Sequence, residues 1–148
     1  MNILEINDRI RQRPPFQMIE RVTELVPNVS AKGIKCVSVN EPYFQGHMPG
    51  YPIMPGVLLI ESAAQLCSLV IESDGSDDSR IYVLLKVRDF KFVKPVIPGD
   101  KLELSAVLVK GNAGLYEFDV TISCDGGVRA KGALLFTSVD KDSVFAEN

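Results

Sequence analysis

A nearly continuous apolar run, Ile53–Ile71, constrains the fold of this chain more than any other feature. It is interrupted at Pro55, Gly56, Glu61 and Gln65. The absence of proline and glycine beyond Gly56 predicts one helix from Val57 to about Glu72. A carboxylate at its centre would be costly in lipid, and a helix that is apolar on all sides needs a covering of protein. We therefore expect a helix buried inside a soluble protein, not a membrane span.

The rest of the chain is typical of β-structure. Apolar Phe118, Val120 and Ile122 alternate with polar residues, which indicates a half-buried antiparallel strand. The expected strands are Met18–Val26, Ala31–Val39, Ile81–Val87, Phe90–Val93, Lys101–Val109, Leu115–Cys124 and Val128–Val139. Asp125-Gly126-Gly127 predicts a tight hairpin turn.

These elements predict a single α+β domain over residues 1–148, in which an antiparallel sheet curls around the helix. An open sheet edge would favour dimerisation. A short amphipathic helix is expected near Ile3–Gln12, a solvated loop at Ser73–Arg80 and a frayed tail over residues 140–148.

Composition excludes several classes of function. The net charge of −3 provides no basic footprint for nucleic acid. Three separated cysteines, Cys36, Cys67 and Cys124, form no CxxC pair and favour reduced thiols in the cytoplasm, without a metal. The N-terminal sequence MNILEINDRIRQR lacks the apolar core of a signal peptide, which also favours the cytoplasm.

One imidazole and one carboxylate stand out as candidates for acid–base chemistry. His47, the only histidine, lies in the string Gly46-His47-Met48-Pro49-Gly50, and Glu61 follows fourteen residues later within the apolar run. Burial would raise the pKa of Glu61 towards neutrality, which suits a proton donor, while a neutral imidazole can accept a proton. Structural alternatives remain for both: a satisfied loop histidine, and a carboxylate that caps a buried amide or faces solvent.

The start of the predicted helix offers a second chemical feature. The first backbone N–H groups of a helix have no intrahelical partner, and the missing side chain of Gly56 would let a substrate oxygen approach them. Such donors could polarise a thioester carbonyl, although Pro55-Gly56 also serves simply to start a helix. Gln65, one turn beyond Glu61, could bind the carboxylate, a substrate or a buried backbone group.

Three strings make the chain similar to a known family. NEPYFQGHMPGYPIMPGVLLIESAAQ (Asn40–Gln65), FKFVKPVIPGD (Phe90–Asp100) and PPFQMIERV (Pro14–Val22) resemble the β-hydroxyacyl-acyl-carrier-protein dehydratases of the FabZ type. The resemblance covers roughly Ile10–Val139 and implies a hotdog fold, a homodimer that can assemble further into a hexamer, and a site at the dimer interface.

The resemblance also implies the reaction and the residues that perform it. Water would be removed from a (3R)-hydroxyacyl chain on acyl carrier protein to give a trans-2-enoyl thioester, in fatty acid or related polyketide biosynthesis, without a cofactor. His47 and Glu61 match the catalytic pair, and the glutamate argues against double-bond isomerisation. The expected substrate-binding residues are Gly56, Val57, Gln65, Phe44 and Met48. A basic group, Lys86, Arg88, Lys91 and Lys94, would attract the acidic carrier protein.

Some positions depart from the family pattern. Met48 replaces a common phenylalanine, and Leu84-Leu85-Lys86 replaces a stretch of small residues near the acyl tunnel, so bulk there could shorten or redirect it. Two alternative functions remain open, an acyl-thioesterase of the same fold and a non-catalytic acyl-binding partner of a synthase complex.

Overall fold

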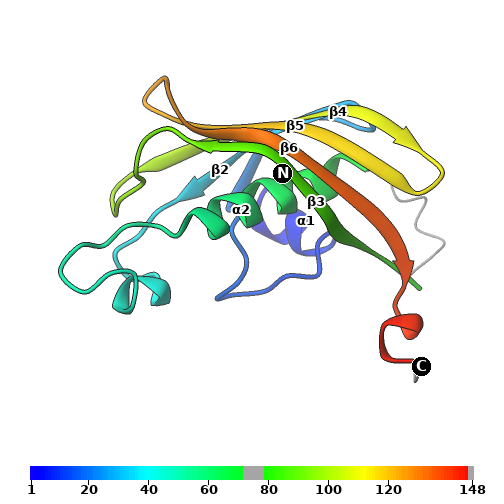
Figure 1. Cartoon of the computed structure of the whole chain (residues 1–148), viewed down its shortest axis with the longest axis horizontal. Coiled ribbons are helices and arrows are strands. Elements are labelled where there is room, and N and C mark those ends of the chain that lie inside the picture. The colour runs from blue at the N-terminus through cyan, green and yellow to red at the C-terminus, as the bar shows by residue number, and fades with distance from the viewer. Residues whose placement is uncertain (72–78, 147–148) are drawn as a thin grey trace.

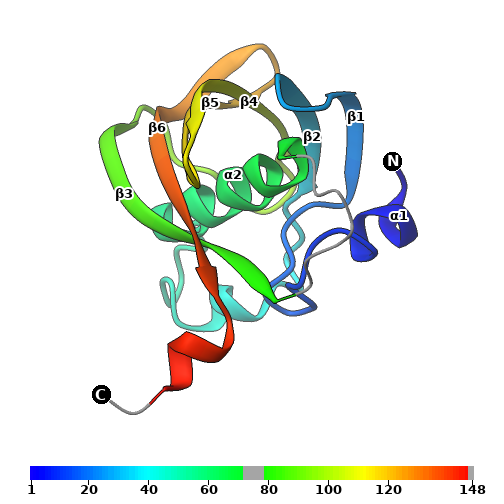
Figure 2. The same cartoon turned by 90° about the vertical axis from the view of Figure 1, so that its right-hand side faces the viewer.

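The apolar run forms the central helix of the molecule. In the computed structural model, which describes residues 1–71 and 79–146, helix α2 spans Gly56–Val70, so the expected helix begins one residue earlier and ends at Val70. Most of its residues from Leu59 to Val70 are buried. Figure 2 shows α2 lying in the hollow of the curled sheet. The helix is therefore covered by protein, as its composition requires.

A single six-stranded antiparallel sheet provides that covering. Its spatial order is β1-β2-β4-β5-β6-β3 (Figure 1). The strands are β1 (Arg21–Val26), β2 (Ser30–Cys36), β3 (Arg80–Phe92), β4 (Lys101–Asn112), β5 (Leu115–Cys124) and β6 (Gly127–Asp140). The helix packs chiefly against β2 and β4. The expected α+β architecture, a long helix wrapped by a curled antiparallel sheet, is confirmed.

The inner face of the sheet carries the core. Phe118, Val120 and Ile122 of β5 are buried, whereas Asp119 between them is exposed. The half-buried strand that the alternation predicted is therefore confirmed. Between β5 and β6, Asp125 and Gly126 have φ values of 50° and 78°. Two successive positive φ values give the tight turn that matches the twist of a hairpin.

The strand expected to break near residue 88 is continuous. We expected two strands, Ile81–Val87 and Phe90–Val93, but β3 runs from Arg80 to Phe92. Its pairing with β6 shifts register at Leu84/Lys86 and at Arg88/Lys91. Asp89, with φ 51°, lies within the second irregularity. A bulge of this kind bends a strand without ending it.

Other boundaries differ by a few residues. Helix α1 covers only Ile3–Asn7, β1 begins at Arg21, and β2 ends at Cys36. A short 3₁₀ helix, η1 (Pro42–Gln45), precedes His47, and another, η2 (Asp142–Phe145), follows β6 in the expected tail. Most of the predicted loop at residues 73–80 lies outside the described residues. No helix in the described ranges is long and apolar enough to cross a bilayer.

Candidate active site

Backbone hydrogen bonds tie His47 both to the segment before it and to the segment after it. Its amide donates to the Tyr43 carbonyl of η1 over 3.0 Å, and its own carbonyl accepts from the Ile53 amide over 3.2 Å. The ring is partly buried, with Nδ1 2.7 Å from the Ile53 carbonyl oxygen. Because a carbonyl can only accept, Nδ1 carries the proton. In the neutral ring the lone pair is then on Nε2, which is the atom available as a base.

Glu61 lies on α2, about one and a half turns from its start. The carboxyl is partly buried, and this desolvation raises its pKa above the ordinary value of 4.5, while a hydrogen bond from Gln65 acts in the opposite direction. A carboxyl group that keeps its proton at higher pH can act as a general acid. The expectation from sequence about the direction of this pKa shift is therefore met.

Gln65 fixes the carboxyl of Glu61 to the rest of the protein. Its Nε2 donates to Glu61 Oε1 and to the Phe16 carbonyl, both over 2.9 Å, and its Oε1 accepts from the Met18 amide over 2.8 Å. The side chain is almost fully buried. Both N–H donors of the Gln65 amide are therefore occupied by protein groups. Of the roles expected for Gln65, the structure shows binding to the Glu61 carboxylate and to buried backbone groups.

The beginning of α2 presents two backbone donors. Pro55 is the N-cap and makes no side-chain capping bond. Among the described residues, neither the Gly56 nor the Val57 amide has a hydrogen-bond partner, and the Val57 side chain is exposed. Two free donors therefore lie where the sequence predicts them, and their action on a thioester carbonyl remains a prediction.

Phe92 adds a contact that sequence reasoning missed. A Cβ atom placed on Gly56 would lie 2.9 Å from Cε1 of the Phe92 ring. The space left by the missing side chain is thus filled by Phe92, which comes from the end of β3 and is half exposed. The glycine is required for this packing. The FKF sequence indicated a strand, but no local pattern could reveal which residue its aromatic rings would meet.

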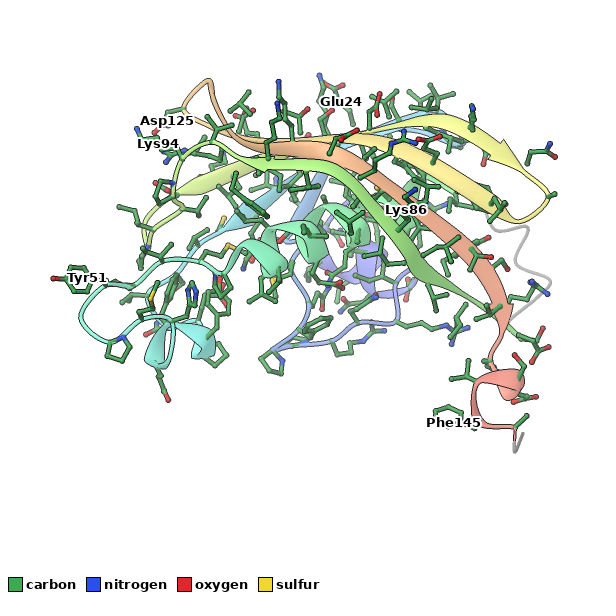
Figure 3. All side chains as sticks on the ribbon, viewed as in Figure 1. Glu24, Tyr51, Lys86, Lys94, Asp125 and Phe145 are labelled. Carbon is green, nitrogen blue, oxygen red and sulfur yellow. The ribbon has the colours of Figure 1, made fainter. Side chains whose placement is uncertain are left out.

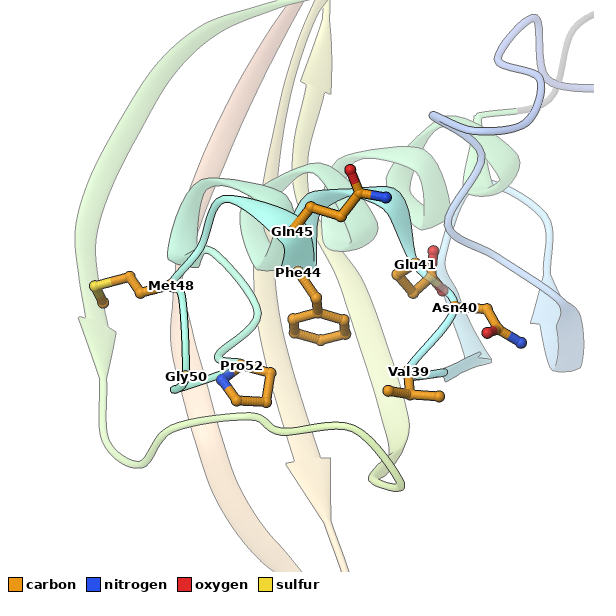
Figure 4. A pocket seen from close by; sticks show the side chains of 8 residues that line it. All are labelled: Val39, Asn40, Glu41, Phe44, Gln45, Met48, Gly50 and Pro52. Carbon is orange, nitrogen blue, oxygen red and sulfur yellow. The ribbon is translucent and has the colours of Figure 1, made fainter.

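Two of the expected substrate-binding residues, Phe44 and Met48, line a shallow depression of about 420 Å³ beside the His47 loop. Figure 4 shows their side chains with those of Gln45 and Pro52 around it. The remaining lining residues are Val39, Asn40, Glu41 and Gly50. Gly56, Val57 and Gln65 do not line it, and neither do His47 and Glu61. This depression therefore brings together only two of the five expected substrate-binding residues.

Within the described part of this chain, no hydrogen bond or ion pair joins His47 to Glu61. Among the residues that the structure describes, the imidazole bonds only to Ile53 and the Glu61 carboxyl only to Gln65. Their joint action in catalysis remains a prediction.

The four basic residues expected to bind a carrier protein are all exposed, but they form a stripe along β3 and the segment directly after it instead of a compact patch. Figure 3 places Lys86 partway along β3. Lys94 lies beside Asp125, at the end of the sheet away from Phe145. Arg88 is paired with Glu117, which reduces its free charge. Lys91 faces Lys131 across the β3–β6 pair. Carrier-protein binding by this stripe also remains a prediction.

No group of three or more histidine, cysteine, aspartate or glutamate residues within residues 1–71 and 79–146 is arranged to hold a metal ion. Cys67 and Cys124 are buried, and desolvation raises the pKa of both thiols, most strongly at Cys67. Neither thiol has the character of an activated nucleophile.

Comparisons of the sequence with known proteins agree on one family. A family model described as a FabA-like domain matches residues 10–132. The chain is 39% identical over 150 residues to the 3-hydroxyacyl-[acyl-carrier-protein] dehydratase FabZ of Myxococcus xanthus, covering 100% of this chain and 98% of the relative. It is 41% identical over 131 residues to the FabZ of Polynucleobacter necessarius, covering 88% of each chain.

Solved structures support the fold. The dehydratase heterocomplex ApeI:P from Xenorhabdus doucetiae is 20% identical with a TM-score of 0.77, covering 94% of this chain and 93% of that one. A hot-dog-like protein from Thermanaerovibrio acidaminovorans is 14% identical with a TM-score of 0.66, covering 84% and 96%. These likenesses establish the hotdog fold, and the sequence matches establish that the chain belongs to the FabZ-type dehydratases of the FabA-like family.

Proposed function

We propose that this protein removes water from a (3R)-hydroxyacyl chain carried by acyl carrier protein, giving the trans-2-enoyl thioester, in fatty acid biosynthesis or a related polyketide pathway. The strongest support is the match to the FabZ of Myxococcus xanthus along the full length of this chain. The fold and the separate base and acid groups described above are consistent with this hydro-lyase activity.

In the proposed mechanism, His47 and Glu61 act on adjacent substrate carbons. Nε2 of His47 accepts the proton from the α-carbon, whose electron pair forms the new double bond. The C–O bond at the β-carbon breaks, and the protonated carboxyl of Glu61 donates its proton so that the hydroxyl leaves as water. His47 ends protonated and Glu61 ionised, and transfer of one proton from His47 to Glu61 through solvent restores both groups. No electrons are gained or lost overall, so this elimination needs no redox cofactor.

The amides of Gly56 and Val57 have a separate role in this proposal. Abstraction of the α-proton moves negative charge onto the thioester carbonyl oxygen. Two unpartnered N–H groups at the positive end of α2 would stabilise that charge.

We further propose that the site is completed by a second copy of the chain, with His47 of one copy facing Glu61 of the other. Within the described part of one chain no hydrogen bond or ion pair joins the two residues, which is consistent with this arrangement. Strand β3 supports it as well, because β3 is thirteen residues long and, among residues 1–71 and 79–146, pairs with β6 alone. An edge of this kind can pair with the same strand of another copy. The dimer could assemble further into a hexamer.

The charged stripe on β3 would contribute to recognition of the carrier. Lys86, Lys91 and Lys94 are exposed, and in the described residues none of them forms an ion pair. Complementary charge would speed the encounter with an acidic carrier protein. Charge reversal at Lys91 and Lys94 should weaken carrier binding, and the loss should shrink at high salt because long-range attraction is screened.

The test is to incubate the purified protein with 3-hydroxyacyl carrier proteins of several chain lengths. Mass spectrometry should detect loss of one water from an intact thioester. Release of a free acid would instead indicate a thioesterase, and an unchanged substrate would indicate a non-catalytic binding partner. The same substrates as coenzyme A thioesters would measure the preference for the carrier.

The division of the site between two chains can be tested by mixing variants. His47→Ala and Glu61→Ala should each lower turnover by several orders of magnitude if both residues act. Mixed heterodimers would contain one intact site, so co-refolding equal amounts should restore about a quarter of the wild-type activity. No recovery, despite proven heterodimers, would place both residues of each site in the same chain.

A further inference from the structure

Lys35 is the one charged side chain among the described residues that is almost completely buried, at 1% exposure. It lies on β2, which is flanked by β1 and β4 and is therefore fixed on both sides. Burying an ammonium group is costly unless it is paired and hydrogen-bonded. The groups that pair with Lys35 therefore show which parts of the chain its buried charge holds together.

Two carboxylates neutralise Lys35, and they belong to different parts of the chain. Lys35 Nζ lies 3.1 Å from Glu20 Oε1 and 2.5 Å from Glu41 Oε1. Glu20 is tied to the sheet, because its Oε2 accepts from the Cys36 amide over 2.8 Å. Glu41 lies outside the sheet, at the residue that caps η1, and its side chain is mostly buried. The Lys35–Glu41 pair thus joins the rigid sheet to the start of the His47 loop.

The connection continues from Glu41 to His47 through the backbone. The Glu41 carbonyl accepts from the Phe44 amide over 3.2 Å, and the Tyr43 carbonyl accepts from the His47 amide over 3.0 Å. Both hydrogen bonds lie within or directly after η1. Only these two hydrogen-bonded turns separate Glu41 from His47. A displacement of Glu41 would therefore also displace the imidazole.

Backbone hydrogen bonds within the loop fix its shape, and a separate set of contacts fixes it to the rest of the protein. Val39, Met48 and Tyr51 are exposed at 70%, 45% and 75%, and Figure 3 shows Tyr51 projecting from the tip of the loop. The side chain of Phe44 is buried in the core, and the Met54 amide bonds to the Val96 carbonyl over 2.8 Å on the far side of the loop. The ion pair is therefore one of the contacts that fix the loop to the sheet and the core, beside the Phe44 side chain and the Met54 amide.

We propose that the Lys35–Glu41 ion pair is a positioning device that sets the orientation of the His47 ring. The pair does not touch the substrate. It holds η1 against β2, and η1 in turn holds the amide of His47. This inference rests on the proposed role of His47 as the base.

The test compares two ion pairs on the same strand. The double variant K35M/E41L removes both charges together, so that no uncompensated charge is left in the interior, and Glu20 remains partly exposed to water. The matched control is K32M/E24L, because Lys32 and Glu24 form an exposed pair at 3.2 Å between β1 and β2, remote from the His47 loop in sequence. An exposed pair of this kind contributes little to stability.

Two measurements separate positioning from simple loss of folding. The first is steady-state kinetics on a 3-hydroxyacyl carrier protein, with thermal unfolding measured on the same samples. The second is NMR of protein with ¹⁵N-labelled histidine, in which His47 is the only imidazole and so gives the only ring signals. We expect kcat of K35M/E41L to fall by about 10- to 100-fold with KM nearly unchanged, since small misplacement of a catalytic group has effects of that size. The ring signals should shift or multiply, whereas K32M/E24L should match the wild type in both measurements.

Two results would overturn the proposal. One is a folded K35M/E41L protein with wild-type kcat. The other is a lower kcat with unchanged ring signals, since the loss would then arise elsewhere. If the wild type shows no dehydration at all, the proposed function fails, while altered ring signals in K35M/E41L would still support the positioning role.

Discussion

Gln65 donates a 2.9 Å hydrogen bond to the carboxyl of Glu61 from one turn further along α2, and the same side chain also binds the segment that leads into β1. The pKa of Glu61 therefore reflects two opposing effects. Burial favours the neutral acid and is the larger effect, while the donor favours the carboxylate. The local structure thus retains a protonated acid but limits how far its pKa rises.

Removal of this donor should change the pH dependence of catalysis. In Gln65→Leu the carboxylate loses its stabilising donor, so the pKa of Glu61 should rise further. If Glu61 acts as the acid, the decline of kcat at alkaline pH should move to higher pH. The variant should also lose about 1–3 kcal/mol of stability, because the Met18 amide and Phe16 carbonyl lose their partner.

A pH–rate profile of kcat checks this, with Ser68→Ala as the control. The Ser68 hydroxyl donates to the Ala64 carbonyl of the same helix and, within the described ranges, to no group of the site, so its removal should leave the profile unchanged. A shift of the alkaline limb to lower pH in Gln65→Leu would contradict the assignment of Glu61 as the acid.

Glu61→Gln should make the protein more stable at mildly alkaline pH while it abolishes turnover. Because the folded-state pKa of Glu61 is raised above its ordinary value of 4.5, ionisation of Glu61 is harder in the folded than in the unfolded chain. The penalty is absent below the unfolded-state pKa, grows above it and is complete once the pH exceeds the folded-state pKa. Glutamine carries no charge and avoids the penalty.

Thermal unfolding as a function of pH measures this effect. The midpoint of Glu61→Gln should exceed that of the wild type at mildly alkaline pH, and the difference should narrow as the pH falls from the raised folded-state pKa towards the ordinary value of 4.5. A difference that grows on acidification would mean that the pKa of Glu61 is lowered in the folded protein.

The packing of β3 on β6 depends on a glycine. A Cβ on Gly132 would lie 2.5 Å from Cδ2 of Phe90 and 2.7 Å from its Cα, and a backbone atom cannot move aside as a side chain can. We expect Gly132→Ala to lower the free energy of unfolding by about 1–3 kcal/mol through overpacking. Denaturant titration measures it, with Gly127→Ala as the control, since a Cβ there would meet its nearest neighbour at an ordinary 3.6 Å. Equal stability of the two variants would argue against this strand packing.

The parts of the fold that follow from local patterns could be predicted from sequence. The apolar run identified α2, strict alternation identified β5, and Asp125-Gly126 identified the hairpin. The candidate pair, His47 and Glu61, emerged because few polar side chains surround them.

Features that depend on distant contacts could not be predicted in this way. The sequence near Lys35 is that of an ordinary strand lysine, and only the fold brings Glu20 and Glu41 to it. The ring of Phe92 reaches Gly56 across thirty-five intervening residues. The continuity of β3 through Asp89 depends on its pairing with β6. The apolar pattern breaks near Asp89, so the sequence alone predicted two strands there.

Strand β3, at one end of the sheet, carries exposed apolar side chains. Leu84 and Val87 are exposed on this strand, at 42% and 40%, although both are apolar. If two copies pair along β3, Leu84→Glu and Val87→Glu together would place four like charges in the interface of the dimer. We expect sedimentation velocity to show dissociation into monomers, and activity to fall in proportion to the loss of dimer because each site would need both chains. Val109→Glu is the control, since Val109 is an exposed apolar residue on an interior strand and should leave assembly unchanged. A Leu84→Glu/Val87→Glu protein that remains dimeric would place the interface on another surface, and full activity in the monomer would show that one chain carries a complete site.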